Sequence, residues 1–218
     1  MRAWVAIALV AFLAMAAPAA RADDGVPAQA RQQTFVVQVA FDEEHGAIGA
    51  GVLVARDGDV LTLATAEHVV SEKGTLQILD VTRRNYYRVI DIQTLPDYDL
   101  ALIRVYAQPD FTAEPVQIGD AAAGEPVTVL GNTGDGFWEP ASGTVLQTSA
   151  QIPGVFGSPR ITIACDACSF GDSGSGVFDS QGRLLGILTR AWRKKNGPVL
   201  FIEVEPAALI RQELLARR

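Results

Sequence analysis

The chain has 218 residues, of which 49% are hydrophobic and 20% charged, and its formal net charge is −7 at pH 7. That length suits one substantial domain or two small fused barrels, and we expect no added recognition module. The acidic balance argues against nucleic acid and anionic membranes as partners, because both carry charge of the same sign.

The first 22 residues have the three parts of a secretory signal peptide. Arg2 supplies a positive start, residues 3–17 are almost wholly apolar, and a small-residue A-x-A site ends at Ala22. The apolar run is shorter than the roughly 20 residues needed to span a bilayer, which favours cleavage over a retained membrane anchor. Cleavage would remove 22 of the 218 residues, leave 196 with a formal charge of −9, and make the product secreted or periplasmic, with no stable membrane insertion.

The polar residues 23–33 predict a flexible mature N-terminus. From residue 34 onward, short runs rich in Val, Ile, Leu and Thr alternate with turn signals made of Gly, Asp, Asn and Pro, which is typical of β-strands. Six runs predict a first β-barrel over residues 34–106: 34–41, 47–55, 60–65, 75–81, 86–93 and 100–105.

A Pro-containing linker, 107–115, separates this series from a second one. Pro206 suits a helix start, and the residues after it place four apolar side chains on roughly one face, which predicts a short C-terminal α-helix over 206–218. The fold class is therefore all-β, with two six-stranded antiparallel β-barrels packed together. The second barrel is predicted over 116–205, from the runs 126–131, 142–149, 160–165, 175–179, 184–190 and 199–204. The apolar face of the helix comprises Leu209, Ile210, Leu214 and Leu215.

The only cysteines are Cys165 and Cys168. An exported chain meets an oxidising compartment, so a local disulfide is favoured. A redox C-x-x-C motif normally opens a helix in a thioredoxin-like setting, which is not visible here. A zinc site needs further ligands, and the two histidines, His45 and His68, lie far upstream. We therefore expect no metal and no other cofactor.

Three short stretches contain the residue types of nucleophilic catalysis: His68 after a predicted strand, Asp99 before another, and Ser173 in a glycine-rich turn. Serine needs a general base within hydrogen-bond reach, and histidine suits that role because its pKa lies near the operating pH. A carboxylate then fixes the tautomer of the imidazole. The glycines allow a tight turn whose backbone N–H groups, those of Gly171 and Ser173, would hold an oxyanion.

Each of these three residues has a weaker rival. Asp97 reads as a surface-turn acid, whereas Asp99 directly precedes four apolar residues of a buried strand. His45 lies in an acidic turn that predicts a solvated hairpin tip. Ser175 shares the glycine-rich turn but belongs to no matching block.

The three stretches resemble the signature blocks of the chymotrypsin-like peptidases: T-A-E-H-V at 65–69, D-L-A-L-I at 99–103 and G-D-S-G at 171–174. The order His, Asp, Ser is that of this family and differs from the orders of the α/β-hydrolases and subtilisins. Residues 49–70 are similar to the bacterial branch that includes the HtrA-type proteases, here without a PDZ domain. The resemblance implies a serine endopeptidase with its active site between the two barrels.

The sequence also departs from the digestive members of that family. No I-V-G-G-type segment follows Ala22, so activation by a new N-terminal amine is not expected. Asp172 matches the position that receives this amine. It either has another partner or caps the turn through its own backbone.

The resemblance also implies a substrate pocket beside the serine. Ala167 resembles its base, and Thr189, Arg190 and Ala191 resemble one wall, with Thr189 also similar to the polar residue that helps hold the triad acid. Neither Ala167 nor Ser169 supplies an acid, and Asp166 could serve only if the loop is differently set, so we expect a small or apolar P1 side chain. The basic run that begins at Arg190 favours a solvated loop over recognition of an acidic substrate.

The leading prediction is hydrolysis of peptide bonds in a protein or peptide substrate, through the triad and an acyl-enzyme intermediate. One alternative is a non-catalytic envelope binding module on the same fold, against which the intact triad argues. Another is an esterase that uses the same three residues.

Overall fold

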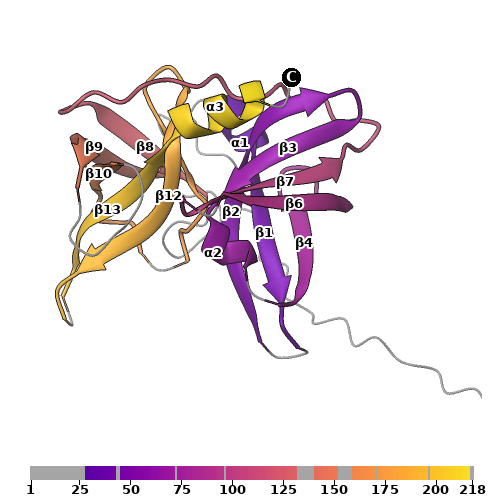
Figure 1. The fold of residues 1–218 in the computed structure, drawn as a ribbon, viewed down its shortest axis with the longest axis horizontal. Coiled ribbons are helices and arrows are strands. Elements are labelled where there is room, and N and C mark those ends of the chain that lie inside the picture. Colours follow the sequence, from indigo (N-terminus) through magenta and orange to yellow (C-terminus); the bar gives the residue numbers. More distant parts are fainter. Residues whose placement is uncertain are drawn as a thin grey trace, which may run out of the picture.

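The protein is represented by a computed structural model that describes residues 28–42, 45–71, 73–95, 97–131, 140–151, 159–169, 171–195 and 197–216. Two β-structures lie side by side, and a C-terminal helix lies above their junction (Figure 1). The predicted signal peptide falls outside the described residues. Within the described ranges, no helix is long and apolar enough to cross a membrane.

The first β-structure is a seven-stranded antiparallel sheet with the strand order β5-β4-β1-β2-β3-β7-β6. A four-residue helix, α2 (Glu67–Val70), follows β3 and packs on β1, β2 and β7 of the same sheet. The strands are β1 (Thr34–Ala40), β2 (Gly46–Asp57), β3 (Val60–Thr65), β4 (Thr75–Asp80), β5 (Asn85–Tyr87), β6 (Val89–Leu95) and β7 (Leu100–Tyr106).

Seven strands arise where six were predicted, because the run 86–93 is divided at Arg88 between β5 and β6. β5 pairs with β4, whereas β6 pairs with β7 at the opposite edge of the sheet. The sheet is therefore a half-barrel whose two edges are not hydrogen-bonded strand to strand. Within the segment predicted to be flexible, the structure has a five-residue helix, α1 (Ala28–Gln32), anchored by the buried Ala30.

The second β-structure is a closed barrel of six strands in the order β10-β13-β12-β11-β8-β9, and it confirms the all-β class with a second, six-stranded barrel. β9 pairs with both β8 and β10, which closes the ring. The strands are β8 (Pro126–Leu130), β9 (Ala141–Ala150), β10 (Arg160–Ala164), β11 (Gly176–Phe178), β12 (Leu184–Arg193) and β13 (Val199–Pro206).

The predicted C-terminal helix is present as α3 (Ala207–Ala216). Its apolar face is narrower than expected. Ile210 is buried and Leu209 and Leu214 are partly buried, but Leu215 is 61% exposed. The helix packs on β12 and β13, and three of the four predicted apolar side chains reach the core, whereas Leu215 faces solvent.

Three apolar clusters hold the molecule together. One lies inside the half-barrel and another inside the closed barrel. The third lies between them and combines Val52 and Leu102 from the first sheet with Phe178 from the second and Ile210 from α3. Because burial of apolar surface is the main driving force of folding, this shared cluster fixes the two β-structures relative to one another.

Candidate active site

The structure brings the three predicted residues together at the junction of the two β-structures. His68 lies on α2, Asp99 immediately precedes β7, and Ser173 lies in the turn before β11. Nδ1 of His68 is 2.8 Å from Oδ2 of Asp99, and Nε2 of His68 is 2.8 Å from Oγ of Ser173. Both distances are those of hydrogen bonds, so each ring nitrogen has its own partner.

The Asp99 carboxylate is held in the ionised form. Burial would raise its pKa, but hydrogen bonds and charge from His68, together with the charge of Arg190, hold the pKa below its usual value. Oδ1 also accepts the backbone N–H of His68 at 3.0 Å. An ionised carboxylate at Nδ1 favours the tautomer in which Nδ1 carries the proton and Nε2 accepts one from serine.

Two glycines shape the serine turn. Gly171 has φ +99 and Gly174 has φ +84, a region that L-residues with a side chain rarely adopt. A Cβ at Gly174 would also lie 2.0 Å from the carbonyl oxygen of Ala50. The backbone of Gly174 donates to the carbonyl of Leu188 at 2.8 Å, which ties the turn to β12.

Asp172 is almost fully buried inside this turn. Its Oδ2 accepts the backbone N–H of Ser169 at 2.5 Å and its carbonyl oxygen accepts the N–H of Ser175 at 3.0 Å, so both its side chain and its backbone have partners within the turn. Burial raises the pKa of the Asp172 carboxyl to about 7, although the Ser169 N–H acts in the opposite direction. This side chain therefore titrates near neutral pH.

A cleft of about 270 Å³ opens beside the three residues. Thr189, Arg190 and Ala191 line it, as do Ser169 and Leu188, whereas the predicted base, Ala167, is exposed and is not among the described lining residues. From the same loop, Ser169 is the residue that lines the described cleft. Within the part of the chain that the structure describes, Thr189 makes no hydrogen bond to Asp99.

Glu205 is a site residue that the sequence did not single out. It lies fully buried on β13, and its Oε1 accepts the backbone N–H of Asp99 at 3.2 Å. Nη1 of Arg160 lies 2.7 Å from each of its carboxylate oxygens. The available signal was a pair of acids in an otherwise apolar strand, at residues 203 and 205.

The rival residues lie elsewhere or are inaccessible. His45 is 71% exposed and pairs with Asp42 at 2.9 Å, and Asp97 is exposed. The hydroxyl of Ser175 is buried and has no hydrogen-bond partner among the described residues. None of these three side chains forms part of the His68 arrangement.

The disulfide predicted between Cys165 and Cys168 is present in the structure, with a Cα–Cα distance of 5.5 Å. Both cysteines are buried against the core of the closed barrel. Across the described ranges, no group of three or more His, Cys, Asp or Glu side chains could hold a metal ion.

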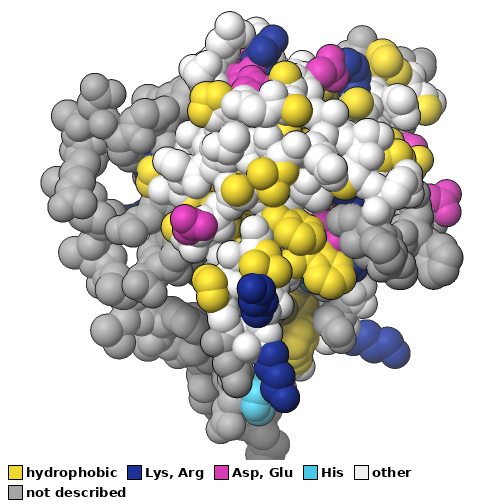
Figure 2. All heavy atoms as spheres, turned by 90° about the vertical axis from the view of Figure 1, so that its left-hand side faces the viewer, with side chains coloured by type: hydrophobic (Ala, Val, Ile, Leu, Met, Phe, Trp, Pro, Cys, Tyr) yellow, Lys and Arg dark blue, Asp and Glu magenta, His cyan; other side chains and the backbone are white. Residues whose placement is uncertain are grey.

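The outer face of the closed barrel carries exposed apolar side chains. Figure 2 shows hydrophobic side chains gathered in the middle of this face, with Lys and Arg below them. Leu146 on β9 and Leu200 on β13 are each about half exposed. Trp192 and Phe201 stack with ring centroids 6.0 Å apart, and the Trp192 indole N–H also contacts the Glu203 carboxylate.

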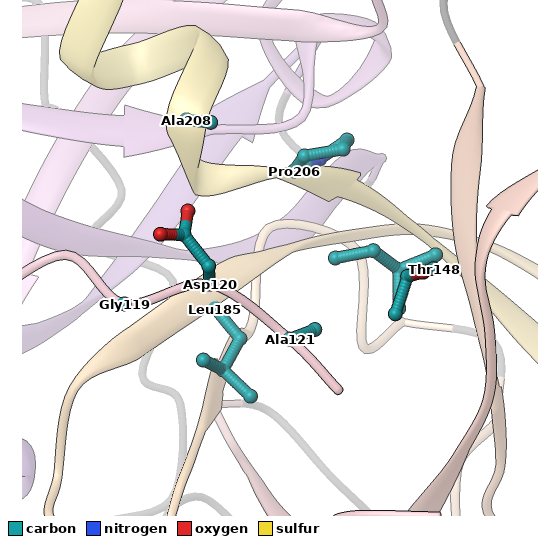
Figure 3. A pocket seen from close by; sticks show the side chains of 8 residues that line it. Gly119, Asp120, Ala121, Thr148, Leu185, Pro206 and Ala208 are labelled. Carbon is teal, nitrogen blue, oxygen red and sulfur yellow. The ribbon is translucent and has the colours of Figure 1, made fainter. Parts of the chain in front are cut away.

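A second hollow, of about 160 Å³, lies where α3 begins. Its side chains are mostly apolar or small, and the Asp120 carboxylate points toward the first turn of the helix (Figure 3). A carboxylate there complements the positive end of the helix dipole. Asp120 also lies 3.7 Å from Arg211, so this hollow has a structural explanation.

Comparison with known proteins decides the family. A model of the trypsin-like peptidase domain matches residues 49–187, more than half of the chain. The chain belongs to the trypsin-like peptidase family. The matched span of this trypsin-like peptidase contains His68, Asp99 and Ser173, and the family resemblance read from the sequence is confirmed.

Solved structures show the same fold for this trypsin-like peptidase. The active form of the Rv3671c protease from M. tuberculosis matches with a TM-score of 0.71 and 19% identity, covering 93% of each chain. The HtrA-type protease AlgW, solved with a tripeptide, has a TM-score of 0.70 and 19% identity, covering 86% of this chain and 60% of its own. The MamO protease domain from Magnetospirillum magneticum has a TM-score of 0.66 and 20% identity, and the match covers 85% of this chain and 97% of the MamO domain. A search of curated proteins finds no match to this chain.

Proposed function

We propose that this trypsin-like peptidase is an exported serine endopeptidase in which Ser173 is the nucleophile, His68 the general base and Asp99 the residue that orients it. The observation that carries the proposal is the continuous chain of contacts from Asp99 through both ring nitrogens of His68 to Oγ of Ser173, each 2.8 Å long. Family membership supports the same reaction class.

In the first half of the reaction, Oγ of Ser173 attacks the carbonyl carbon of the scissile bond while its proton passes to Nε2 of His68. The resulting imidazolium is stabilised by the Asp99 carboxylate. The N–H groups of Gly171 and Ser173 hold the negative oxygen of the tetrahedral intermediate. His68 then returns the proton to the leaving nitrogen, the C–N bond breaks, and an acyl-enzyme remains.

In the second half, a water molecule attacks the acyl carbon while His68 again accepts a proton. The ester bond to Ser173 breaks, the serine oxygen recovers its proton from His68, and the carboxylic product leaves. Every proton stays within the arrangement of His68, Ser173 and the reactants. This reaction requires no cofactor.

The substrate is proposed to be an extended segment of a protein or peptide. β12 runs along one side of the cleft beside Ser173 through Thr189, Arg190 and Ala191. Leu188 and Ala191 are the apolar groups on this side, which supports a small or apolar side chain at P1. Exposed strand edges can bind extended peptides through main-chain hydrogen bonds.

The assignment of the nucleophile is tested with a fluorophosphonate probe, which phosphonylates an activated serine and releases fluoride. We expect the wild-type chain to be labelled stoichiometrically and Ser173→Ala to remain unlabelled. Ser175→Ala is the matched control, since it removes a hydroxyl from the same turn but not the proposed nucleophile.

Label that persists on Ser173→Ala would assign the nucleophile elsewhere. A folded wild-type chain that takes no label would favour the non-catalytic binding module. Labelled protein that hydrolyses small acyl esters but no peptide in a diverse library would favour the esterase.

A further inference from the structure

A buried ion pair in the closed barrel touches the backbone of the proposed triad acid. Glu205 on β13 and Arg160 on β10 are both buried, and Nη1 of Arg160 lies 2.7 Å from both carboxylate oxygens of Glu205. Oε1 of Glu205 also accepts the N–H of Asp99 at 3.2 Å. This contact crosses from the second β-structure to the first, over 106 residues of sequence.

Stability alone is a weak reason for such a pair. Removing two charges from water is costly, and apolar residues of similar volume often stabilise a protein as well or better. The Arg83–Asp80 pair in the half-barrel is more exposed and contacts the core tyrosine Tyr87. The Arg160–Glu205 pair differs because the Glu205 carboxylate contacts Asp99, and Asp99 in turn contacts His68.

The position of Asp99 explains why an external acceptor is needed there. The strand ladder of β7 begins one residue later, where Leu100 pairs with Leu95 of β6. The Asp99 N–H therefore lies just outside the ladder, and Glu205 supplies its partner. The orientation of the Asp99 main chain decides where its carboxylate meets Nδ1 of His68.

We propose that Glu205, held by Arg160, is a positioning residue that fixes the backbone of Asp99 and thereby the orientation of His68. The inference rests on the proposed function of the three residues. The contacts among Ser173, His68 and Asp99 thus extend across the junction to Glu205, so that β13 of the closed barrel fixes the orientation of the Asp99 carboxylate. A displacement of about 1 Å in such an arrangement can lower a rate about 100-fold.

Two double variants isolate the hydrogen-bond acceptor. Arg160→Met with Glu205→Gln removes both charges but keeps an oxygen that can face the Asp99 N–H. Arg160→Met with Glu205→Leu removes the charges and the acceptor at nearly the same volume. We expect the glutamine variant to be labelled by the fluorophosphonate at Ser173 at least tenfold faster than the leucine variant, with both chains unfolding cooperatively.

Proton NMR provides a readout that a merely structural role would not move. The Nδ1–H of His68, bonded to the Asp99 carboxylate, should give a downfield resonance that the glutamine variant keeps and the leucine variant shifts or loses. Matched controls carry Arg83→Met with Asp80→Asn or Asp80→Leu. We expect the two control variants to differ in stability. Their rates of labelling at Ser173 and the chemical shifts of their His68 Nδ1–H should be the same.

Equal labelling rates and identical His68 resonances in the folded glutamine and leucine variants would overturn the proposal. Should the leucine variant not fold, hydrogen exchange of the wild-type protein decides. The Asp99 amide must then exchange far more slowly than that of the exposed Asp97, and equally fast exchange counts against Glu205. The resonance and exchange measurements use no substrate, so they remain decisive even if wild-type Ser173 takes no label and the proposed function fails.

Discussion

The backbone N–H of Ala50, on β2 of the half-barrel, donates a 2.9 Å hydrogen bond to the carbonyl oxygen of Ser173 in the closed barrel. This bond attaches the serine turn to the sheet that leads into His68. Gly49 lies beside it, where a Cβ would come within 2.6 Å of the same carbonyl. The close approach of the two main chains therefore sets the distance between the serine and its base.

We expect Gly174→Ala to abolish most reactivity of Ser173. The new methyl group would meet the Ala50 carbonyl at 2.0 Å, in addition to the strain of about 1–2 kcal/mol that a positive φ imposes on an L-residue. Gly124→Ala is the control, since Gly124 has φ +81 and no atom within 4 Å of its Cβ position. Fluorophosphonate labelling should fall more than 100-fold for Gly174→Ala alone, and equal effects of the two changes would contradict this reading of the turn.

Asp99→Asn should lower the rate of peptide hydrolysis about 10⁴-fold while leaving the fold intact. The amide carries no charge and can donate its N–H to Nδ1, so the imidazole proton moves to Nε2, which then cannot accept the proton of Ser173. Asp97→Asn changes an exposed acid two residues away and should leave the rate within about twofold. The measurement is kcat on a cleavable peptide at saturating concentration, and similar rates for the two variants would remove Asp99 from the mechanism.

The run that begins at Arg190 was expected to be a solvated loop, but Arg190 lies on β12 and lines the cleft beside Ser173, so it should favour substrates that carry an acidic residue near the scissile bond. Its side chain is half exposed in the cleft, 3.5 Å from the buried Glu203 carboxylate. A hydrogen bond to a charged group contributes about 1.5–3 kcal/mol, so matched peptides with and without Asp or Glu should differ roughly 10- to 100-fold in kcat/KM. Arg190→Gln should erase this difference, whereas Arg193→Gln should preserve it. A wild-type enzyme indifferent to acidic residues would leave Arg190 with a structural role.

The stability of the protein should depend on the protonation of Asp172. Its pKa is raised to about 7 in the folded state by burial, against an ordinary value of about 3.9 in the unfolded chain. The folded protein therefore holds a proton between these values that the unfolded chain has released. The contribution of protonated Asp172 to the free energy of unfolding is therefore fully present below about pH 4 and is lost as the pH rises through 7.

Asp172→Asn removes this titration but keeps an oxygen for the Ser169 N–H. The free energy of unfolding of the variant, relative to wild type, should rise between pH 5 and pH 8 by as much as about 3 kcal/mol. Urea denaturation at several pH values measures the difference, in which the other titrating groups cancel. A difference that stays constant over this range would show that Asp172 is ionised throughout.

Much of the fold was accessible from local pattern. Turn residues and β-rich runs located twelve of the thirteen strands within a few residues, because those signals are local. The division of residues 86–93 was not accessible, since it depends on β5 and β6 pairing with strands at opposite edges of the sheet. The exposure of Leu215 likewise depends on how far along α3 the core extends.

In the candidate site too, the residues with a local sequence signal were predicted and those defined by long-range contacts were not. His68, Asp99 and Ser173 were found from short motifs whose chemistry requires particular residue types. Glu205 was missed because its importance comes from one hydrogen bond to a backbone group 106 residues away, and a backbone N–H leaves no mark in a sequence. The exposed position of Ala167 could not be predicted either, since it follows from the path of the loop that the disulfide closes.

The shared apolar cluster between the two β-structures has a consequence for the order in which the enzyme matures. Synthesis completes the strands around His68 and Asp99 long before β13 and α3 exist, yet Ile210 of α3 belongs to the cluster that joins the halves. A growing chain can therefore assemble the half-barrel without assembling the junction. The two halves can therefore join around Ser173 only after β13 and α3, residues 199–216, have been synthesised.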